Sequence, residues 1–182
     1  MVGPLVTLVP YAFCFQPTDQ EIIRSFLYRM AVKRELLLPP YNEYVHEEDL
    51  FDFKEPWEIW EEYGGDDHFN QDLYFFCELE RLSPTGLRIR RNIGEGIWSE
   101  KQPTKLVYNE DGHPNPMGRK KMFLYENRGS EEHGGWILDE YSLLVGADGR
   151  AQTASKDRYE FPSVICRLRK NDKSGGKKKR NN

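Results

Sequence analysis

The feature that most constrains this fold is a change of hydrophobic pattern at the Gly64-Gly65-Asp66-Asp67 sequence. Before this breaker, apolar residues recur at the spacing of helices. After it they come in short runs, each about the length of a β-strand. Because helices are predicted early and strands late in a chain of 182 residues, the order favours an α+β fold, an antiparallel sheet with its helices early in the sequence.

The first helix is predicted to begin at residues 18–21, Thr-Asp-Gln-Glu, which fit a capping box. The apolar residues that follow form a single stripe at helical spacing: Ile22, Ile23, Phe26, Leu27 and Met30. The helix should end before residues 36–40. A second, shorter helix is predicted between residues 47 and 62, where Leu50, Phe53 and Trp57 supply the apolar side chains and Pro56 suits a first turn.

Strands are predicted at residues 73–77, 87–91, 96–98, 105–108, 121–125, 136–144 and 163–170. The first of these runs is apolar on both faces, which favours a central strand. The last run alternates, with Val164, Cys166 and Leu168 on one face and Ile165, Arg167 and Arg169 on the other. We therefore expect one domain, followed by a basic tail over residues 171–182 that should be disordered.

The net charge of −4 conceals a strong asymmetry along the chain. Residues 1–80 contain 5 basic and 17 acidic residues, whereas residues 81–128 contain 10 basic and 5 acidic residues. Because charges farther apart than about 8 Å are largely screened at physiological salt, a basic region on an acidic protein can still bind phosphate. The overall charge therefore does not exclude nucleic acid as a partner.

Several function classes find little support in the residue pattern. The three cysteines are far apart and form no CxxC pair, so they are expected to be reduced core thiols. The four histidines lack ligand spacing, and neither a metal nor a cofactor is expected. No run approaches the roughly 18 apolar residues of a membrane span, and no secretory signal is recognised. Without a nucleophile elbow or a Walker loop, an enzyme ranks well behind a binding protein.

Five sequence blocks, taken in order, carry a family resemblance. Residues 13–23 are similar to FRFHPTDEELV, and residues 48–58 to EVDLY with PWDL. Residues 74–98 resemble YFF, NGSR and TGSGYW in succession, residues 118–141 resemble GMKKTLVFY and NWVMHEY, and residues 164–168 resemble VLCRIYK. These blocks belong to the NAC family of plant transcription factors, which this chain resembles over about residues 8–170.

The resemblance implies one NAC-like domain over residues 8–170, built as a twisted antiparallel sheet flanked by a few helices. It implies a sequence-specific regulator that works in the nucleus, without a cofactor or a membrane. It implies a dimer, with itself or with another NAC protein, made at the N-terminal segment. It also implies that a sheet-edge strand enters the major groove of double-stranded DNA, which is wide enough to admit a β element.

The same resemblance supplies the candidate DNA-binding residues. Arg88 and Arg91 match the arginines of the family's SRTNR segment, Lys120 and Lys121 match its paired lysines, and Arg128 matches a basic loop position. The candidate set is Arg88, Arg91, Lys101, Lys105, Lys120, Lys121 and Arg128. We expect both arginines on an exposed strand face, where replacement by alanine would scarcely change stability. Trp98 is expected to support the core.

The segment after Trp98 departs from the family's KATGKD pattern. Ser99 replaces a lysine, Glu100 adds a carboxylate, and Pro103 removes a backbone donor. Glu100 should either lower DNA affinity by repelling phosphate or accept a hydrogen bond from a cytosine amino group. Base preference is therefore expected to be altered or lost.

The candidate dimer residues are Phe13, Cys14 and Glu21. Cys14 replaces the family arginine that pairs across the dimer with the glutamate matching Glu21, although the capping box alone also explains Glu21. Dimerisation is expected either to persist through Phe13 and backbone pairing or to change partners.

The basic run Lys177, Lys178, Lys179 and Arg180 is interpreted as a nuclear-import signal, with a solubilising tail as the alternative. For the whole chain, the rival interpretation is a NAC-like interaction module that dimerises with DNA-binding relatives and inhibits them.

Overall fold

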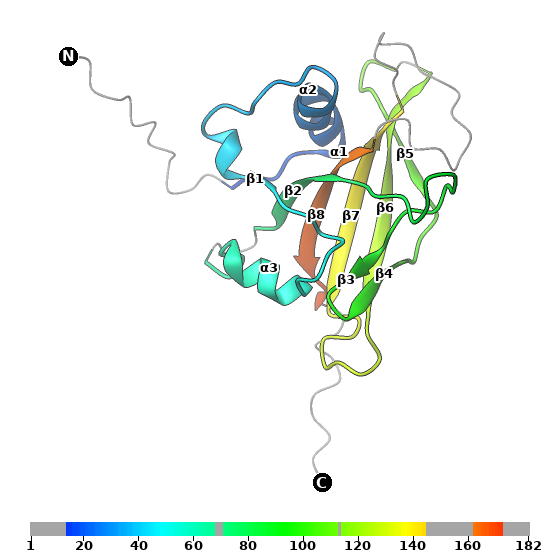
Figure 1. Ribbon diagram of the computed structural model, residues 1–182. Coiled ribbons are helices and arrows are strands. Elements are labelled where there is room, and N and C mark those ends of the chain that lie inside the picture. The colour runs from blue at the N-terminus through cyan, green and yellow to red at the C-terminus, as the bar shows by residue number, and fades with distance from the viewer. Residues whose placement is uncertain (1–13, 68–70, 113, 145–161, 173–182) are drawn as a thin grey trace, which may run out of the picture.

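A single twisted β-sheet forms the centre of the molecule (Figure 1). The computed structural model describes residues 14–67, 71–112, 114–144 and 162–172. Its strands are β1 (Val45–Glu47), β2 (Leu73–Glu78), β3 (Asn92–Ile93), β4 (Gly96–Glu100), β5 (Lys105–Tyr108), β6 (Pro116–Glu126), β7 (Trp136–Leu143) and β8 (Ser163–Lys170). The order across the sheet is β1-β2-β8-β7-β6-β4-β3, and β5 also pairs with β6.

All strand pairs are antiparallel except β1 with β2, which is parallel. The predicted α+β class is confirmed. The run at residues 73–77, predicted to be a central strand, forms β2, which has a neighbour on each side but lies next to the short edge strand β1.

The predicted first helix is a continuous helical segment made of α1 (Asp19–Glu21), the π-helical turn η1 (Ile22–Leu27) and α2 (Tyr28–Ala31). The capping box is formed as expected: the Glu21 amide donates to Thr18 Oγ1 at 3.2 Å, and the Thr18 amide donates to Glu21 Oε2 at 2.8 Å. Two of the backbone donors left unpaired at the start of the helix are thereby satisfied. A short 3-10 turn, η2 (Tyr41–Glu43), follows.

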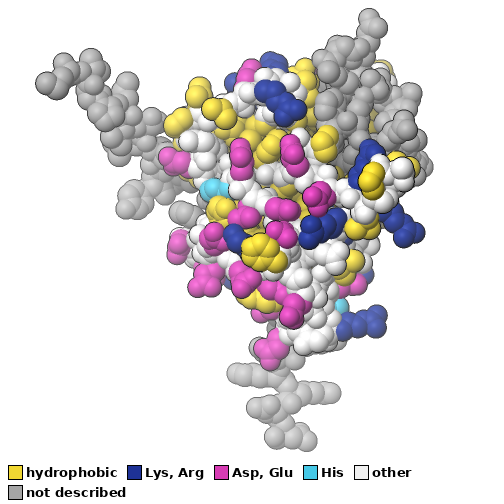
Figure 2. Space-filling view, viewed as in Figure 1, with side chains coloured by type: hydrophobic (Ala, Val, Ile, Leu, Met, Phe, Trp, Pro, Cys, Tyr) yellow, Lys and Arg dark blue, Asp and Glu magenta, His cyan; other side chains and the backbone are white. Residues whose placement is uncertain are grey.

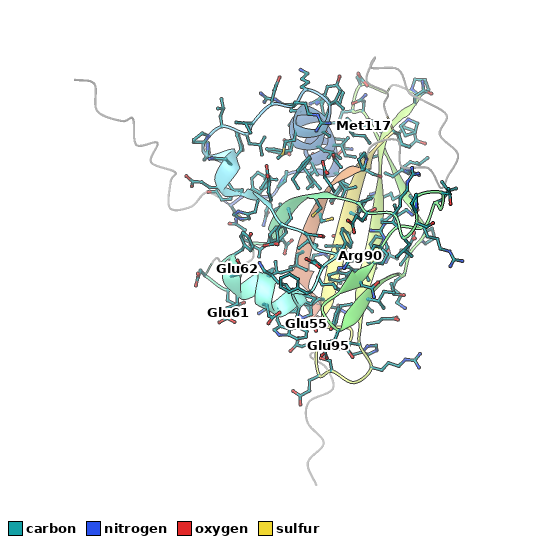
Figure 3. All side chains as sticks on the ribbon, in the orientation of Figure 1. Glu55, Glu61, Glu62, Arg90, Glu95 and Met117 are labelled. Carbon is teal, nitrogen blue, oxygen red and sulfur yellow. The ribbon has the colours of Figure 1, made fainter. Side chains whose placement is uncertain are left out.

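The second helix, α3 (Pro56–Glu62), begins with Pro56 in its first turn, as the sequence predicts. Glu55 and Glu58 form a second capping box around that proline. Glu55 also accepts hydrogen bonds from the Glu95 amide at 2.8 Å and from the Tyr125 hydroxyl at 2.8 Å. Figure 3 shows Glu55 beside Glu95, at the turn that joins β3 to β4. The start of α3 is thus fastened to the sheet.

Each face of the sheet is covered by a different helix. On one face Ile59 and Trp60 of α3 pack against a core that includes Trp98, Phe123 and Leu138. On the other face Ile23 and Leu27 of η1 pack against a second core that includes Tyr74, Tyr141 and Ile165. The alternation predicted for residues 163–170 is confirmed, because Val164, Cys166 and Leu168 lie in the first core and Ile165 lies in the second.

Gly118 on β6 allows the helical segment to approach this second face. A Cβ atom at this position would lie 2.5 Å from the Ile23 side chain and 2.7 Å from the Ser142 carbonyl oxygen. The absence of a side chain therefore sets how closely η1 packs on the sheet.

Three sequence expectations are wrong in detail. Residues 87–91 form no strand and contribute only an isolated bridge between Arg81 and Ile89. Phe53, one of the apolar residues of the second helical region, is 75% exposed and precedes α3. Cys14 is exposed, whereas Cys77 and Cys166 are buried thiols as expected. Local apolar content alone did not reveal which side chains would be covered by distant elements.

Candidate nucleic-acid interface

The candidate interface is the outer edge of β6, where β4 and β5 pair one after the other. β4 pairs with residues 123–126 and β5 with residues 116–120, so residues 101–104 form a loop midway along this edge. Residues 100–106 are all exposed. This loop corresponds to the segment in which the sequence departs from the family pattern.

The four candidate lysines lie in or beside this loop. Lys101 is its first residue, and the Lys101 amide donates to the Met122 carbonyl at 3.2 Å. Lys105 follows its last residue and is the register partner of Lys120. Lys121 follows Lys120 on β6. We call this set, Lys101, Lys105, Lys120 and Lys121, the lysine edge.

Asp19, the first residue of α1, binds two members of the lysine edge. Its carboxylate lies 3.0 Å from Lys120 Nζ and 3.7 Å from Lys105 Nζ, and it accepts a hydrogen bond of 2.8 Å from the Tyr141 hydroxyl. Burial alone would raise the pKa of Asp19. The hydrogen bonds from Tyr141 and Lys120, together with both lysine charges, outweigh burial, so that the pKa of Asp19 is lowered from 3.8.

The other two lysines also have carboxylate partners. Lys121 Nζ lies 3.6 Å from a carboxylate oxygen of Glu100, and Lys101 pairs with Glu126. The Lys105 side chain is 70% exposed and that of Lys101 is 39% exposed, whereas those of Lys120 and Lys121 are 21% and 18% exposed. Lys101 and Lys105 are therefore the members best placed to meet a phosphate.

Arg91 occupies a different environment from the one predicted. Its side chain is only 14% exposed and forms a two-pronged ion pair with Glu140, including a hydrogen bond of 3.2 Å from Nη2 to Oε1. The guanidinium group lies 4.5 Å from the ring centre of Phe123 and 5.2 Å from that of Phe51. The expected exposed position is wrong for Arg91, because this side chain satisfies a carboxylate that is 1% exposed in the core.

Arg88 and Arg128 are both exposed and form no salt bridge with any side chain that the structure describes. Arg88 lies in the segment that leads to Arg91. The Arg91 carbonyl accepts a hydrogen bond from the Trp98 amide of β4 at 2.8 Å. Trp98 itself is 2% exposed, and its indole donates to the Leu50 carbonyl at 3.0 Å. Its predicted structural role is confirmed.

The candidate dimer segment is only partly described. Phe13 lies outside the described residues. Cys14 is exposed, and Glu21 is engaged with Thr18 in the capping box. Both line an open groove of about 640 Å³ together with Leu36 and Leu38, which are 84% and 71% exposed.

Acidic side chains dominate a different part of the surface. Figure 2 shows many of them gathered around α3 and the strands beside it. The predicted import residues Lys177, Lys178, Lys179 and Arg180 lie outside the described residues. The described part of the chain contains no cluster of three or more His, Cys, Asp or Glu side chains arranged to hold a metal ion. None of its helices is long and apolar enough to span a membrane.

Comparison with known proteins identifies the family. Residues 10–143 match the model of the No apical meristem (NAM) protein family. The chain belongs to this family, the NAC family. It is 30% identical to Protein ATAF2 of Arabidopsis thaliana over 166 residues, which are 88% of the chain and 53% of that protein.

Other NAC relatives agree over most of the chain. NAC domain-containing protein 1 of Solanum lycopersicum is 29% identical, covering 96% of the chain and 58% of the relative. NAC transcription factor 25 of Arabidopsis thaliana is 30% identical, covering 93% of the chain and 48% of the relative. The chain spans about half the length of these curated relatives.

Sequence reasoning missed the two carboxylates that organise the NAC-type basic region, Asp19 and Glu140. In the sequence Asp19 shows only as part of a helix cap, and Glu140 only as part of a strand block. The alternation of β7 would place Glu140 on the same face as Leu138, which is a signal for a buried charge needing a cation. The Asp19 contacts join residues about a hundred positions apart in the chain, and no local pattern indicates them.

Proposed function

We propose that this protein is a nuclear, dimeric regulator that binds double-stranded DNA through the lysine edge. NAC family membership supports the general class, since relatives of this chain are named as transcription factors. The observation that carries the proposal is the exposed loop 101–104. Lys101 begins this loop, Lys105 follows it, and Lys120 and Lys121 lie on the adjacent strand β6. Ammonium groups on a projecting sheet edge can neutralise phosphates on either side of a groove.

Arg88 and Arg128 complete the proposed contact set, because their exposed guanidinium groups can hold phosphates. For Arg91 we propose a supporting role only. Its guanidinium group pairs with Glu140 on β7, the register partner of Lys121, and so supports the strand that carries the lysine edge.

A salt-dependent binding measurement tests the proposal. Replacing Lys101 and Lys105 with alanine should weaken binding to duplexes with a CACG-type core and to unrelated duplexes alike. The slope of log affinity against log salt should become shallower by about 0.9 for each phosphate that is no longer neutralised. The matched control is Lys33→Ala with Arg34→Ala, at the end of the helical segment. Unchanged affinity and slope in the Lys101/Lys105 variant would contradict binding through this edge.

The proposed dimer contact lies at the N-terminal segment, around Phe13, Cys14 and Glu21. Removing residues 1–16 would also remove Phe15, a core residue that stacks on Tyr44 with ring centres 5.1 Å apart. Removal of residues 1–13 is therefore the cleaner test, and light scattering should report a monomer. A shortened chain that keeps the mass of a dimer would show that Phe13 and the residues before it are not needed for the contact.

A second candidate function is favoured by the carboxylates of the lysine edge. Asp19, Glu100 and Glu126 each pair with at least one of its lysines, which reduces the charge available to DNA. On this alternative the protein forms heterodimers with DNA-binding NAC relatives and lowers their affinity. Gel-shift titration of such a relative distinguishes the two: a loss of the shifted complex supports inhibition, and a second shifted species supports joint binding.

A further inference from the structure

Three tryptophans lie together where α3 meets the start of β7. Trp57 and Trp60 come from α3 and Trp136 from β7, and they line an open pocket of about 790 Å³. The rings of Trp60 and Trp136 lie 5.6 Å apart between centres. We call this site the tryptophan pocket.

One lysine of the chain already lies in this pocket. The Lys170 ammonium group is 5.5 Å from the ring centre of Trp60 and 5.9 Å from that of Trp136. It also pairs with Asp66 at 2.6 Å, and Asp66 accepts a hydrogen bond of 2.9 Å from the Trp60 indole. Indole faces and a carboxylate together form a site that favours a cation.

The pocket has more negative charge than Lys170 can balance. Five carboxylates line it, those of Glu61, Asp66, Asp67, Glu132 and Asp172, and Lys170 is its only lining cation among the described residues. Figure 3 shows Glu61 on the outward side of α3, away from the sheet. The Lys170 and Asp66 side chains are themselves 48% and 73% exposed, so the resident pair leaves the rim open to solvent.

We propose that the tryptophan pocket binds a lysine-rich segment, and that this segment is residues 177–180 of the same chain, Lys-Lys-Lys-Arg. Asn171 and Asp172 line the pocket, so the chain leaves β8 at its rim. Four residues, two of them glycine, separate Asp172 from Lys177. They span up to about 17 Å when extended, which is enough to turn back to the pocket.

Proximity and charge favour this occupant over a free basic peptide. A short flexible connection gives a tethered group an effective concentration in the millimolar range. Residues 177–180 carry four positive charges, and the five lining carboxylates face one lysine. The inference does not depend on DNA binding. If residues 177–180 also serve as an import signal, docking and receptor binding compete for the same side chains.

The experiment compares the full chain with a full-length variant in which Lys177, Lys178, Lys179 and Arg180 are all replaced by glutamine. The indole N–H resonances of the tryptophans provide the signal. Removal of the four cations should shift the resonances of Trp57 and Trp60. The resonance of Trp98 should stay in place, since its indole is buried and bonded to the Leu50 carbonyl. Trp98 is thus an internal control.

A peptide of residues 173–182, added to the neutralised variant, should restore the original resonances. Combining Glu61→Gln with Asp67→Asn in that variant should weaken peptide binding by about fivefold, because two exposed carboxylates no longer attract the peptide. Glu110→Gln, a change of the same type at an exposed position before β6, should leave peptide affinity unchanged.

Two outcomes would overturn the proposal. If neutralising residues 177–180 leaves the Trp57 and Trp60 resonances unmoved and the peptide does not bind, the pocket takes no lysine-rich segment. If the resonances are unmoved but the peptide does bind, the pocket accepts basic segments from other molecules and is not occupied by the chain's own.

Discussion

The lysine edge and the tryptophan pocket each bring lysines and carboxylates together, but lysines outnumber carboxylates at the edge, whereas carboxylates outnumber lysines in the pocket. At the edge, the four lysines meet three carboxylates, those of Asp19, Glu100 and Glu126. In the pocket, five carboxylates meet one lysine. Because surface charges act over about 8 Å at physiological salt, each region attracts a ligand according to its own balance and not to the net charge of −4.

The difference also separates charges that hold the fold together from charges available to a ligand. Arg91 and Asp19 are largely covered and have several internal partners. Lys105, Arg88 and the carboxylates at the pocket rim are exposed. Exposure and pairing, more than residue type, therefore decide which substitutions should change stability and which should change binding.

The largest expected effect is on stability, from Arg91→Ala. Removing the guanidinium group takes away the cation that pairs with the buried Glu140 carboxylate, which should cost about 3 kcal/mol of unfolding free energy. Arg88→Ala, at an exposed position, should change it by less than about 0.5 kcal/mol. Urea denaturation of both variants checks this. Equal, small decreases would mean that Arg91 belongs with the exposed charges after all.

Asp19→Asn should have the next largest effect, about 1–2 kcal/mol at pH 7, because the variant lacks the charge that holds Lys120 and Lys105. The pKa of Asp19 is lowered from 3.8 in the folded protein, so its contribution is complete above about pH 5 and declines as the pH falls through the folded-state pKa. Asparagine does not titrate. The difference between the two urea midpoints should therefore shrink as the pH falls from 7 to 3, and a constant difference would contradict the ion-pair role.

The smallest expected effect is on DNA affinity, where the same change of charge is compared in the two regions. Glu100→Lys removes the carboxylate beside Lys121 and adds a cation to the lysine edge, so non-specific DNA affinity should rise several-fold, with a salt slope steeper by up to about 0.9. Glu61→Lys makes the same charge change in the tryptophan pocket and should have little effect on DNA. Fluorescence anisotropy at several salt concentrations measures both. Equal increases in affinity would mean that overall charge, and not the local balance, controls binding.

Much of this architecture could be predicted because its signals are local. The Thr18–Glu21 capping box, the position of Pro56 and the alternation along β8 each depend on a few neighbouring residues, and each is confirmed. Residues 87–91 show the limit of such reasoning. Their composition suits a strand, but the chain there makes only an isolated bridge.

The candidate site was harder to predict because its character depends on long-range pairs. Sequence blocks located the basic residues, but nothing near Arg91 indicates that Glu140 lies within reach. The tryptophan pocket was missed entirely for the same reason. Trp57 and Trp60 share α3, but Trp136 lies far along the chain on β7, and only the packing of α3 on β7 brings the three together.

The position of Asp19 couples two parts of the molecule that the sequence presents as separate. Residues 14–17 lead directly into the helix that Asp19 begins, and the Asp19 carboxylate holds two ammonium groups of the lysine edge. Any change that displaces the first turn of α1 would therefore move this carboxylate away from Lys105 and Lys120. The charge that the lysine edge presents to solvent thus depends on how the helical segment packs on the sheet, as well as on the residues of the edge itself.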